Sequence, residues 1–200
     1  MDFGSETLKV FEKAPQVGGV IVASDEEKTI NFVKMLLQEM DKRKSLFAGF
    51  GGDFRSYCKD ESHKCPNIVV VLNNYSGFAD EFEDLQEAFE LLVRDGVKYG
   101  IYFAVTASST NAVRYKIQQN FKMMFTMQLN DATDYSMIVG KTDGLVPSKY
   151  KGRGLVSLDR VYEFQTAYCS DADDVGEFLR DFCSKLSTEA ETTAKKIPVL

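Results

Sequence analysis

The apolar run Ile68–Leu72, read as IVVVL, constrains the fold of this chain more than any other feature. It is rich in β-branched side chains and ends abruptly at two polar residues, Asn73 and Asn74. A short apolar run with such a boundary is typical of a central strand of a parallel sheet, buried on both faces. Because parallel strands need long crossover connections, we expect helices between the strands.

The segments around this run alternate between strand and helix patterns. We expect strands at residues 19–23, in YGIYFAVTA and in KMMFTMQL, and a hairpin in LVSLDRVYEFQTAY. Helices are expected over residues 25–42 and 80–93, in TNAVRYKIQQNF, and in a short segment that ends at Gly140. A last helix should begin near Asp171 and bury the apolar residues Val175, Phe178, Leu179, Phe182 and Leu186.

This alternation predicts an α/β fold with a mainly parallel central sheet flanked by helices. A length of 200 residues with 44% hydrophobic content allows one domain with a substantial core. We expect that domain to span residues 1–188 and to be followed by a polar tail or linker over residues 189–200. The sequence leaves open whether the natural chain continues beyond Leu200.

The charge balance and the apolar runs exclude several classes of function. The net charge is −6 and the acidic residues are dispersed, so nucleic-acid binding through a broad basic face is disfavoured. No apolar run is long enough to span a membrane, and the N-terminus lacks the pattern of a signal peptide. We therefore expect a soluble module that does not bind nucleic acid.

The cysteines and the single histidine do not predict a metal site. Cys58, His63 and Cys65 are close in sequence, but their spacing fits no common zinc site and no fourth ligand is evident. Cys169 and Cys183 stand alone. Scattered free thiols suit a reducing cytoplasm, and none of the thiols carries a catalytic signature.

The stretch GGVIVASDEEKTINF, residues 18–32, has the outline of a phosphate-binding loop: a strand, a tight turn, Lys28, Thr29 and then a helix. In a functional loop, glycines let the backbone N–H groups converge on the phosphates. Here Val22 and Glu27 stand where the first and last glycines belong. Neither residue has the backbone freedom of glycine, so the loop is predicted to be degenerate.

Three consecutive carboxylates at the start of this helix also disfavour a phosphate. Asp25, Glu26 and Glu27 lie where the helix dipole would attract an anion, and they can neutralise that end themselves. The sequence SDEE also matches a capping box in which Ser24 is the N-cap and Glu27 reaches back. We favour this cap over a functional phosphate loop.

The second half of a nucleotide site would lie at the end of the Ile68–Leu72 strand. A P-loop ATPase carries there an Asp that orients magnesium and a Glu that activates water, whereas this chain has Asn73 and Asn74. A neutral amide binds magnesium poorly and cannot accept the proton of a water nucleophile. Whether the site was lost or the asparagines simply end a strand, hydrolysis by the usual mechanism is not expected.

These motifs in this order resemble the FtsK/SpoIIIE family of P-loop translocases. The resemblance rests on the degenerate GKT-like loop, the degenerate acidic pair, YGIYFAVTASSTNAV and PSKYKGRGLV. DFGSETLKVF, NFKMMFTMQLNDATDYSMIVG and GRGLVSLDRVYEFQTA are similar to the third, C-terminal ATPase-like module of type VII secretion motors. One departure is that Ala107 and Ser108 replace the Gln and Arg that are common in the family.

The resemblance implies a RecA-like P-loop core, one of three tandem modules in a membrane-anchored motor that exports WXG-type proteins. It implies as partners the preceding ATPase modules of the same polypeptide, WXG-type substrates and other secretion subunits, and it leaves open a hexameric full-length assembly. It places the module on the cytoplasmic side of the bacterial cell membrane. The terminal module of such motors is linked to recognition of export signals.

The favoured function is a non-hydrolysing, ATPase-like module that acts in substrate recognition and in assembly or regulation of the motor. Under this hypothesis Lys28, Thr29, Asn73 and Asn74 are vestigial cofactor-binding positions, and no catalytic residue, metal ligand or cofactor is expected. Tyr75 and Phe78, which follow the asparagines, either contact a substrate helix or cover the edge of the sheet.

Two alternatives remain open. An active secretion ATPase would bind ATP and magnesium through Lys28 and Thr29, with Arg153 or Arg114 as contacts across subunits. A DNA translocase module is the third function, and the acidic charge and missing motor residues count against it.

Overall fold

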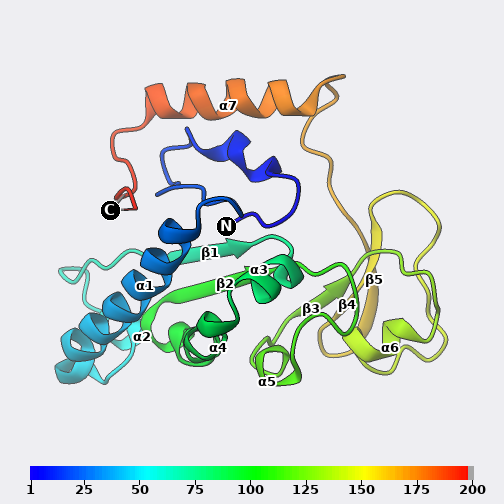
Figure 1. Cartoon of the computed structure of the whole chain (residues 1–200), viewed down its shortest axis with the longest axis horizontal. Coiled ribbons are helices and arrows are strands. Elements are labelled where there is room, and N and C mark those ends of the chain that lie inside the picture. Colours follow the sequence, from blue (N-terminus) through cyan, green and yellow to red (C-terminus); the bar gives the residue numbers. More distant parts are fainter. Residues whose placement is uncertain (198–200) are drawn as a thin grey trace. The chain divides into compact units, whose positions relative to one another are not determined.

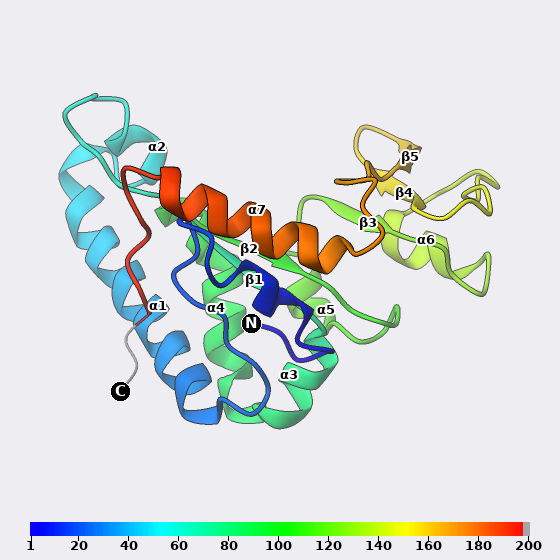
Figure 2. The same ribbon diagram turned by 90° about the horizontal axis from the view of Figure 1, so that it is seen from above.

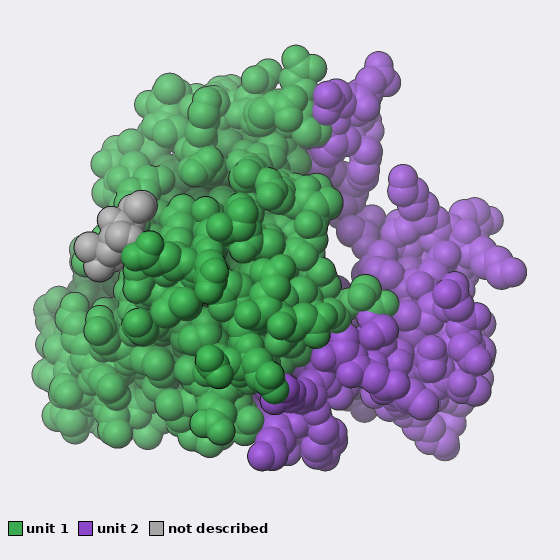
Figure 3. Space-filling view, viewed as in Figure 1, with its two compact units in different colours: residues 1–108, 176–200 green, residues 109–175 purple. Residues whose placement is uncertain are grey.

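The computed structural model describes residues 1–197, which fold as two compact units (Figure 3). Unit 1 comprises Met1–Ser108 and Gly176–Leu200, and unit 2 comprises Ser109–Val175. Each unit has its own sheet, parallel in unit 1 and antiparallel in unit 2. The expected division into a domain over residues 1–188 and a tail stays a prediction.

Unit 1 is built on two parallel strands, β1 (Ile68–Leu72) and β2 (Ile101–Val105), whose register pairs Ile68 with Ile101 (Figure 1). The crossover between them runs through α3 (Tyr75–Glu81), a 3-10 turn (Glu83–Leu85), α4 (Gln86–Asp95) and a second 3-10 turn (Gly96–Tyr99). The positions of both strands and the helical connection between them are as predicted.

The single helix predicted over residues 80–93 is wrong, because the chain forms α3 and α4 with a break at Phe82. The backbone of Phe82 is not helical, with φ −126° and ψ 59°. Its ring is buried, stacks on Phe78 and meets Phe3 edge-on. The break therefore coincides with a residue that fixes α3 to the N-terminal segment.

The longest helix, α1 (Glu26–Phe47), continues beyond the predicted end at residue 42 and packs against α4. The buried residue Arg43 links this helix to the segments that precede the two strands. The guanidinium of Arg43 donates to the carbonyl oxygens of Tyr99 and Pro66, each at 2.9 Å, and pairs with Glu39 at 2.8 Å. These partners compensate the cost of burying the charge and connect α1 to the residues that lead into β1 and β2.

Only one face of the β1–β2 sheet is fully covered, so the prediction that β1 is buried on both faces is wrong. Val70 and Leu72 are buried on the side of α4, whereas Val69 and Val71 on the other side are 64% and 41% exposed. The last helix, α7 (Val175–Glu189), lies on that other side (Figures 1 and 2).

The side chains predicted to anchor α7 are not buried. Cys183 is the buried residue of this helix, and Phe182 is 47% exposed. The helix exists as predicted, although it begins at Val175 and not near Asp171. Beyond it, the backbone N–H groups of Ala194 and Ile197 donate to the carbonyl oxygens of Pro15 and Gly18. The last three residues of the predicted tail lie outside the described range.

Residues 19–23 do not form the predicted strand. Ile21 and Val22 are buried, but the segment joins the sheet through one isolated parallel bridge between Val22 and Asp2. Asp2 bridges to Asn73 as well. Residues 1–3 therefore lie between the 19–23 segment and the end of β1, and the predicted strand has no long neighbour.

Unit 2 holds an antiparallel sheet in the order β3 (Met124–Thr126), β4 (Arg153–Ser157), β5 (Val161–Gln165). The predicted hairpin corresponds to β4 and β5. The helices of unit 2 are α5 (Tyr115–Gln118) and α6 (Asp134–Val139). One face of the sheet packs on α6 through the buried side chains of Tyr135, Val139 and Leu155.

Within residues 1–197 no helix is both long and apolar enough to cross a membrane. The same described residues contain no group of three or more His, Cys, Asp or Glu side chains placed to hold a metal ion. Cys58, Cys65, Cys169 and Cys183 are free thiols.

Candidate functional site

The loop before α1 adopts a different cap from the one predicted. The helix begins at Glu26 with Asp25 as the N-cap, so the capping box centred on Ser24 is wrong. The carboxylate of Asp25 makes no cap hydrogen bond; its Oδ2 accepts from the backbone N–H of Val22 at 3.1 Å. The carboxylate turns back into the loop because that N–H would otherwise lack a partner.

Lys28 and Thr29, the predicted phosphate and magnesium positions, are occupied by neighbours in the chain. The Lys28 Nζ lies 3.5 Å from the Val20 carbonyl oxygen and 3.9 Å from the Asp25 Oδ2. The fully buried Thr29 donates its hydroxyl to the Asp25 carbonyl oxygen at 3.0 Å. The Asp25 carboxylate thus accepts a loop N–H and faces the lysine, two contacts that a bound phosphate would make in a phosphate loop.

Asn73 and Asn74 also have their polar groups engaged. The Asn73 Nδ2 donates to Asp2 Oδ1 and its Oδ1 accepts from the Thr106 hydroxyl, both at 2.8 Å. The Asn74 backbone N–H donates to the same hydroxyl at 3.0 Å, and its Nδ2 donates to the Phe3 carbonyl oxygen at 2.8 Å. Asn74 has a φ of 62°, a left-handed conformation that asparagine tolerates better than most residues.

Asp2 is the member of this site that sequence reasoning missed. Its side chain is fully buried and accepts from the Gly4 and Leu8 backbone N–H groups, each at 3.0 Å, as well as from Asn73. Burial by itself raises the pKa of this carboxyl, but the hydrogen bonds from Leu8, Asn73 and Gly4 outweigh it and hold the pKa below its usual value. An acid followed two residues later by glycine was the only local signal, because its partner Asn73 is 71 positions away.

The two halves of the predicted nucleotide site are therefore brought to one edge, with the N-terminal segment between them. Asp2 forms parallel bridges to Val22 in the loop half and to Asn73 in the strand half. Arg114 and Arg153, the candidate contacts across subunits, belong to unit 2 and not to the unit that holds this site. Arg153 lies 4.0 Å from Glu163 on the neighbouring strand.

Tyr75 and Phe78 are not surface contacts. Both side chains are fully buried, and the Tyr75 hydroxyl donates to Gln86 Oε1 at 2.6 Å. Phe78 packs among Phe3, Phe82 and Phe89. The hypothesis that these two residues contact a substrate helix is wrong, because they form part of the core beside the end of β1.

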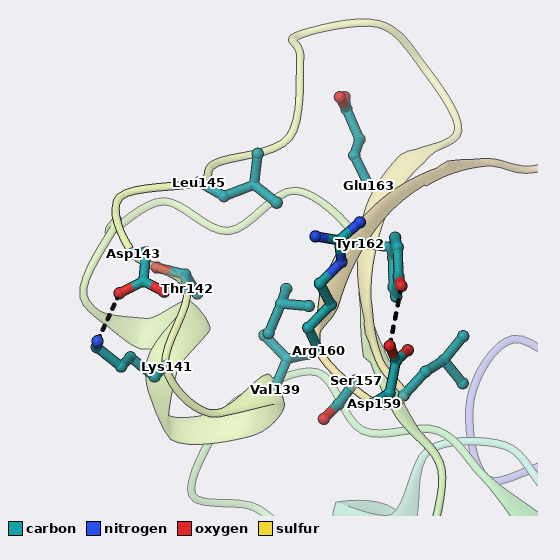
Figure 4. A pocket seen from close by; sticks show the side chains of 12 residues that line it. Val139, Lys141, Thr142, Asp143, Leu145, Ser157, Asp159, Arg160, Tyr162 and Glu163 are labelled. Carbon is teal, nitrogen blue, oxygen red and sulfur yellow. Dashed lines mark hydrogen bonds and ion pairs between the residues drawn. The ribbon is translucent and has the colours of Figure 1, made fainter.

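A separate hollow of 630 Å³ lies in unit 2 between the end of α6 and the β4–β5 turn (Figure 4). Its charged side chains have partners within the unit: Lys141 pairs with Asp143 at 2.8 Å, and the Tyr162 hydroxyl donates to Asp159 at 3.2 Å. The Arg160 guanidinium lies over the Tyr162 ring at 4.9 Å. None of the predicted site residues lines this hollow.

Comparison with known proteins assigns a family. The sequence model of the FtsK/SpoIIIE family matches residues 1–142. The ESX secretion system protein YukB of Bacillus subtilis (strain 168) is 29% identical over 203 residues, which cover 99% of this chain and 13% of that protein. The chain therefore spans about an eighth of the length of this relative.

Solved structures agree with the sequence comparison. EssC (ATPases 2 and 3) of Geobacillus thermodenitrificans has a TM-score of 0.87 at 25% identity and is matched over 100% of this chain and 39% of that one. Thermomonospora curvata EccC (ATPases 2 and 3), solved in complex with a signal sequence peptide, has a TM-score of 0.78 at 21% identity over 100% and 38%. The second likeness shows the fold alone. The α/β fold of this chain is that of these ATPase domains.

Proposed function

The chain belongs to the FtsK/SpoIIIE family, and from that premise we propose that it is a non-hydrolysing, ATPase-derived module of a type VII protein secretion motor. It acts in substrate recognition and in assembly or regulation of the motor. Its homology to secretion proteins over almost its whole length supports the placement in such a motor.

The observation that carries the proposal is the Asp25 carboxylate. It accepts a hydrogen bond from the Val22 N–H and faces the Lys28 ammonium. A carboxylate of the protein therefore already contacts the groups that would bind a nucleotide phosphate. An incoming phosphate would have to displace it or meet a like charge within a few ångströms, and each such contact costs on the order of 1 kcal/mol or more. Lys28, Thr29, Asn73 and Asn74 are accordingly vestigial, and neither ATP nor magnesium is a cofactor.

The strand half of the site supports the same conclusion. Asn73 stands in the position of the magnesium-orienting carboxylate. Its side-chain amide is already hydrogen-bonded to Asp2 and Thr106. Asp2 is a carboxylate at this edge, but it is fully buried and its oxygens already accept from Gly4, Leu8 and Asn73. A carboxylate in that state neither binds a hydrated magnesium ion nor accepts a proton from water.

The proposed partners follow from the family. They are the preceding ATPase modules of the same polypeptide, WXG-type secreted substrates and other secretion subunits, in an assembly that is hexameric when full-length. The module works on the cytoplasmic side of the bacterial cell membrane, to which the full-length protein is anchored. Substrate recognition is supported by the relative from Thermomonospora curvata, which was solved with a signal sequence peptide.

Calorimetric titration with ATP, with and without magnesium, tests the absence of a nucleotide site. We expect no binding at micromolar nucleotide and no phosphate release by the chain or by its Lys28→Ala variant. Magnesium-dependent binding and turnover that disappear in Lys28→Ala would establish the active secretion ATPase instead. Pulldown of secretion substrates, with and without the upstream module, tests the recognition role independently of nucleotide.

A DNA translocase is the remaining alternative. The net charge of −6 disfavours it, because nonspecific DNA binding depends on cationic contacts with phosphates. We expect no retardation of duplex DNA at physiological salt. Salt-dependent DNA binding under those conditions would revive this function.

A further inference from the structure

One face of the unit 2 sheet has an unusual composition. The register pairs Phe125 of β3 with Val156 of β4, and Val156 with Tyr162 of β5, so these side chains share a face. Phe164 lies on it too, because its ring meets that of Phe125 edge-on at 6.1 Å. The two-residue period of a strand adds the methionines that flank β3. We call this the outer face; it consists of Met123, Phe125, Met127, Gly154, Val156, Tyr162 and Phe164.

The strand positions of the outer face carry no charged residue, and the side chains contributed by or next to β3 are exposed. Arg160, in the turn between β4 and β5, lies with its guanidinium over the Tyr162 ring at 4.9 Å at one end of the face. Met123 and Phe125 are 60% and 61% exposed, and Met127 is 42% exposed. The opposite face, which packs on α6, does carry a charged residue, Glu163, beside the buried Leu155. An antiparallel sheet with one solvated face normally alternates apolar-in with polar-out. The outer face of this sheet instead has the apolar composition of a covered face.

We propose that the outer face is the docking surface for a neighbouring ATPase module of the same polypeptide. The proposal rests on the proposed function, since it takes the chain to be one module of a multi-module motor. It adds to that function the surface through which this module is assembled.

The composition of the face favours a permanent partner. Interfaces that never separate resemble a domain core, with few charges and many aromatic residues and methionines. A secreted substrate leaves after each export event and would return this apolar surface to water, where it would promote aggregation. A partner joined by the chain covers the face at all times.

A covalently joined module is also the partner that the related chains offer. In the Geobacillus structure a chain of this fold makes up 39% of a longer chain that contains ATPases 2 and 3. Tethering raises the effective concentration of the neighbour to about the millimolar range, which stabilises even a modest interface.

Methionine oxidation tests this proposal without any substitution. Met123 and Met127 report on the outer face, and Met137 on α6, which is 61% exposed and outside that face, is the matched internal control. Dilute peroxide oxidises accessible thioethers, and peptide mass spectrometry gives the rate at each residue. In the isolated chain we expect all three to react quickly. In the natural polypeptide that includes the neighbouring module, Met123 and Met127 should react about tenfold more slowly, as sulfurs that have lost access to the oxidant.

A substitution then assigns the protection to the face. Phe125→Asp in the longer polypeptide should restore rapid oxidation of Met123 and Met127, whereas Phe125→Leu should keep them protected. Circular dichroism of both variants checks that unit 2 remains folded, and a Phe125→Asp variant that stays folded with both methionines protected would contradict the proposal.

Every other pattern overturns the proposal. If Met123 and Met127 are oxidised as fast as Met137 in the longer polypeptide, no module covers the face. Protection that appears only with an added substrate peptide makes it a substrate surface, and protection that grows with concentration of the isolated chain makes it a contact between copies. Slow oxidation in the dilute isolated chain means that no neighbour is needed. None of these oxidation rates depends on nucleotide. ATP binding and turnover would therefore contradict the proposed function without changing the conclusion about the outer face.

Discussion

The Nδ2 group of Asn73 donates a hydrogen bond to the buried Oδ1 of Asp2 across 2.8 Å, joining residues that are 71 positions apart. This contact holds the N-terminal segment against the end of β1, at the predicted strand half of the nucleotide site. The polar end of β1 therefore has a structural use in this chain.

We expect Asp2→Asn to lower the free energy of unfolding by about 2 kcal/mol, the usual contribution of hydrogen bonds to a buried charged group. The new amide places an N–H₂ group next to the N–H donors of Gly4 or Leu8, so one of the present hydrogen bonds is lost. Urea unfolding at pH 7 measures the change. The exposed Glu12→Gln variant, near the same segment, is the control and should lie within about 0.5 kcal/mol of the parent.

The same carboxyl predicts a pH dependence. The pKa of Asp2 is lower in the folded chain than in the unfolded chain, so the ionised group stabilises the fold. This contribution is fully present above the unfolded pKa, near 4, and is lost as the pH falls through the lower folded pKa. The stability difference between the parent and Asp2→Asn should therefore shrink below about pH 4. A difference that stays constant from pH 7 to pH 3 would contradict the assigned shift.

Much of this architecture could be predicted because it depends on local pattern. The apolar runs of β1 and β2 are enough to predict strands, and the periodicity of α1 is enough to predict a helix. The role of Asp2 could not be predicted, because it depends on a partner 71 residues away. Tyr75 and Phe78 follow a polar pair and so resembled exposed loop residues, but their burial depends on rings contributed by distant elements.

The sequence also does not show what covers an apolar strand, as the outer face of unit 2 and the exposed side of β1 illustrate. Val69 and Val71 belong to an apolar run, and such a run indicates a covered strand without saying what covers it. The prediction of the α1 N-cap was wrong for a local reason. Ser24 and Asp25 are both good N-caps, and in the structure Asp25 takes the N-cap position while its carboxylate accepts a hydrogen bond from the Val22 N–H.

Lys28→Ala should barely change the protein. Its ammonium faces a half-exposed carboxylate at 3.9 Å, and such pairs contribute about 0.5 kcal/mol or less. In an active ATPase the same substitution would abolish turnover. Thermal unfolding and substrate pulldown should both match the parent, with Lys34→Ala, on an exposed position of the same helix, as the matched control. Loss of substrate binding in Lys28→Ala alone would show that this lysine has kept a function.

Arg43→Met is expected to be the most damaging single change on α1. Methionine replaces the aliphatic part of the arginine side chain, but it leaves the carbonyl oxygens of Tyr99 and Pro66 without their donor and removes the closer of the two cations that pair with Glu39. Removing one partner from a buried charged network costs about 3 kcal/mol or more. Lys44→Met, at the adjacent exposed position, tests the same side chain without that network and should cost less than about 0.5 kcal/mol. Urea unfolding of the two variants gives the comparison, and equal stabilities would mean that Arg43 does not hold α1 to the sheet.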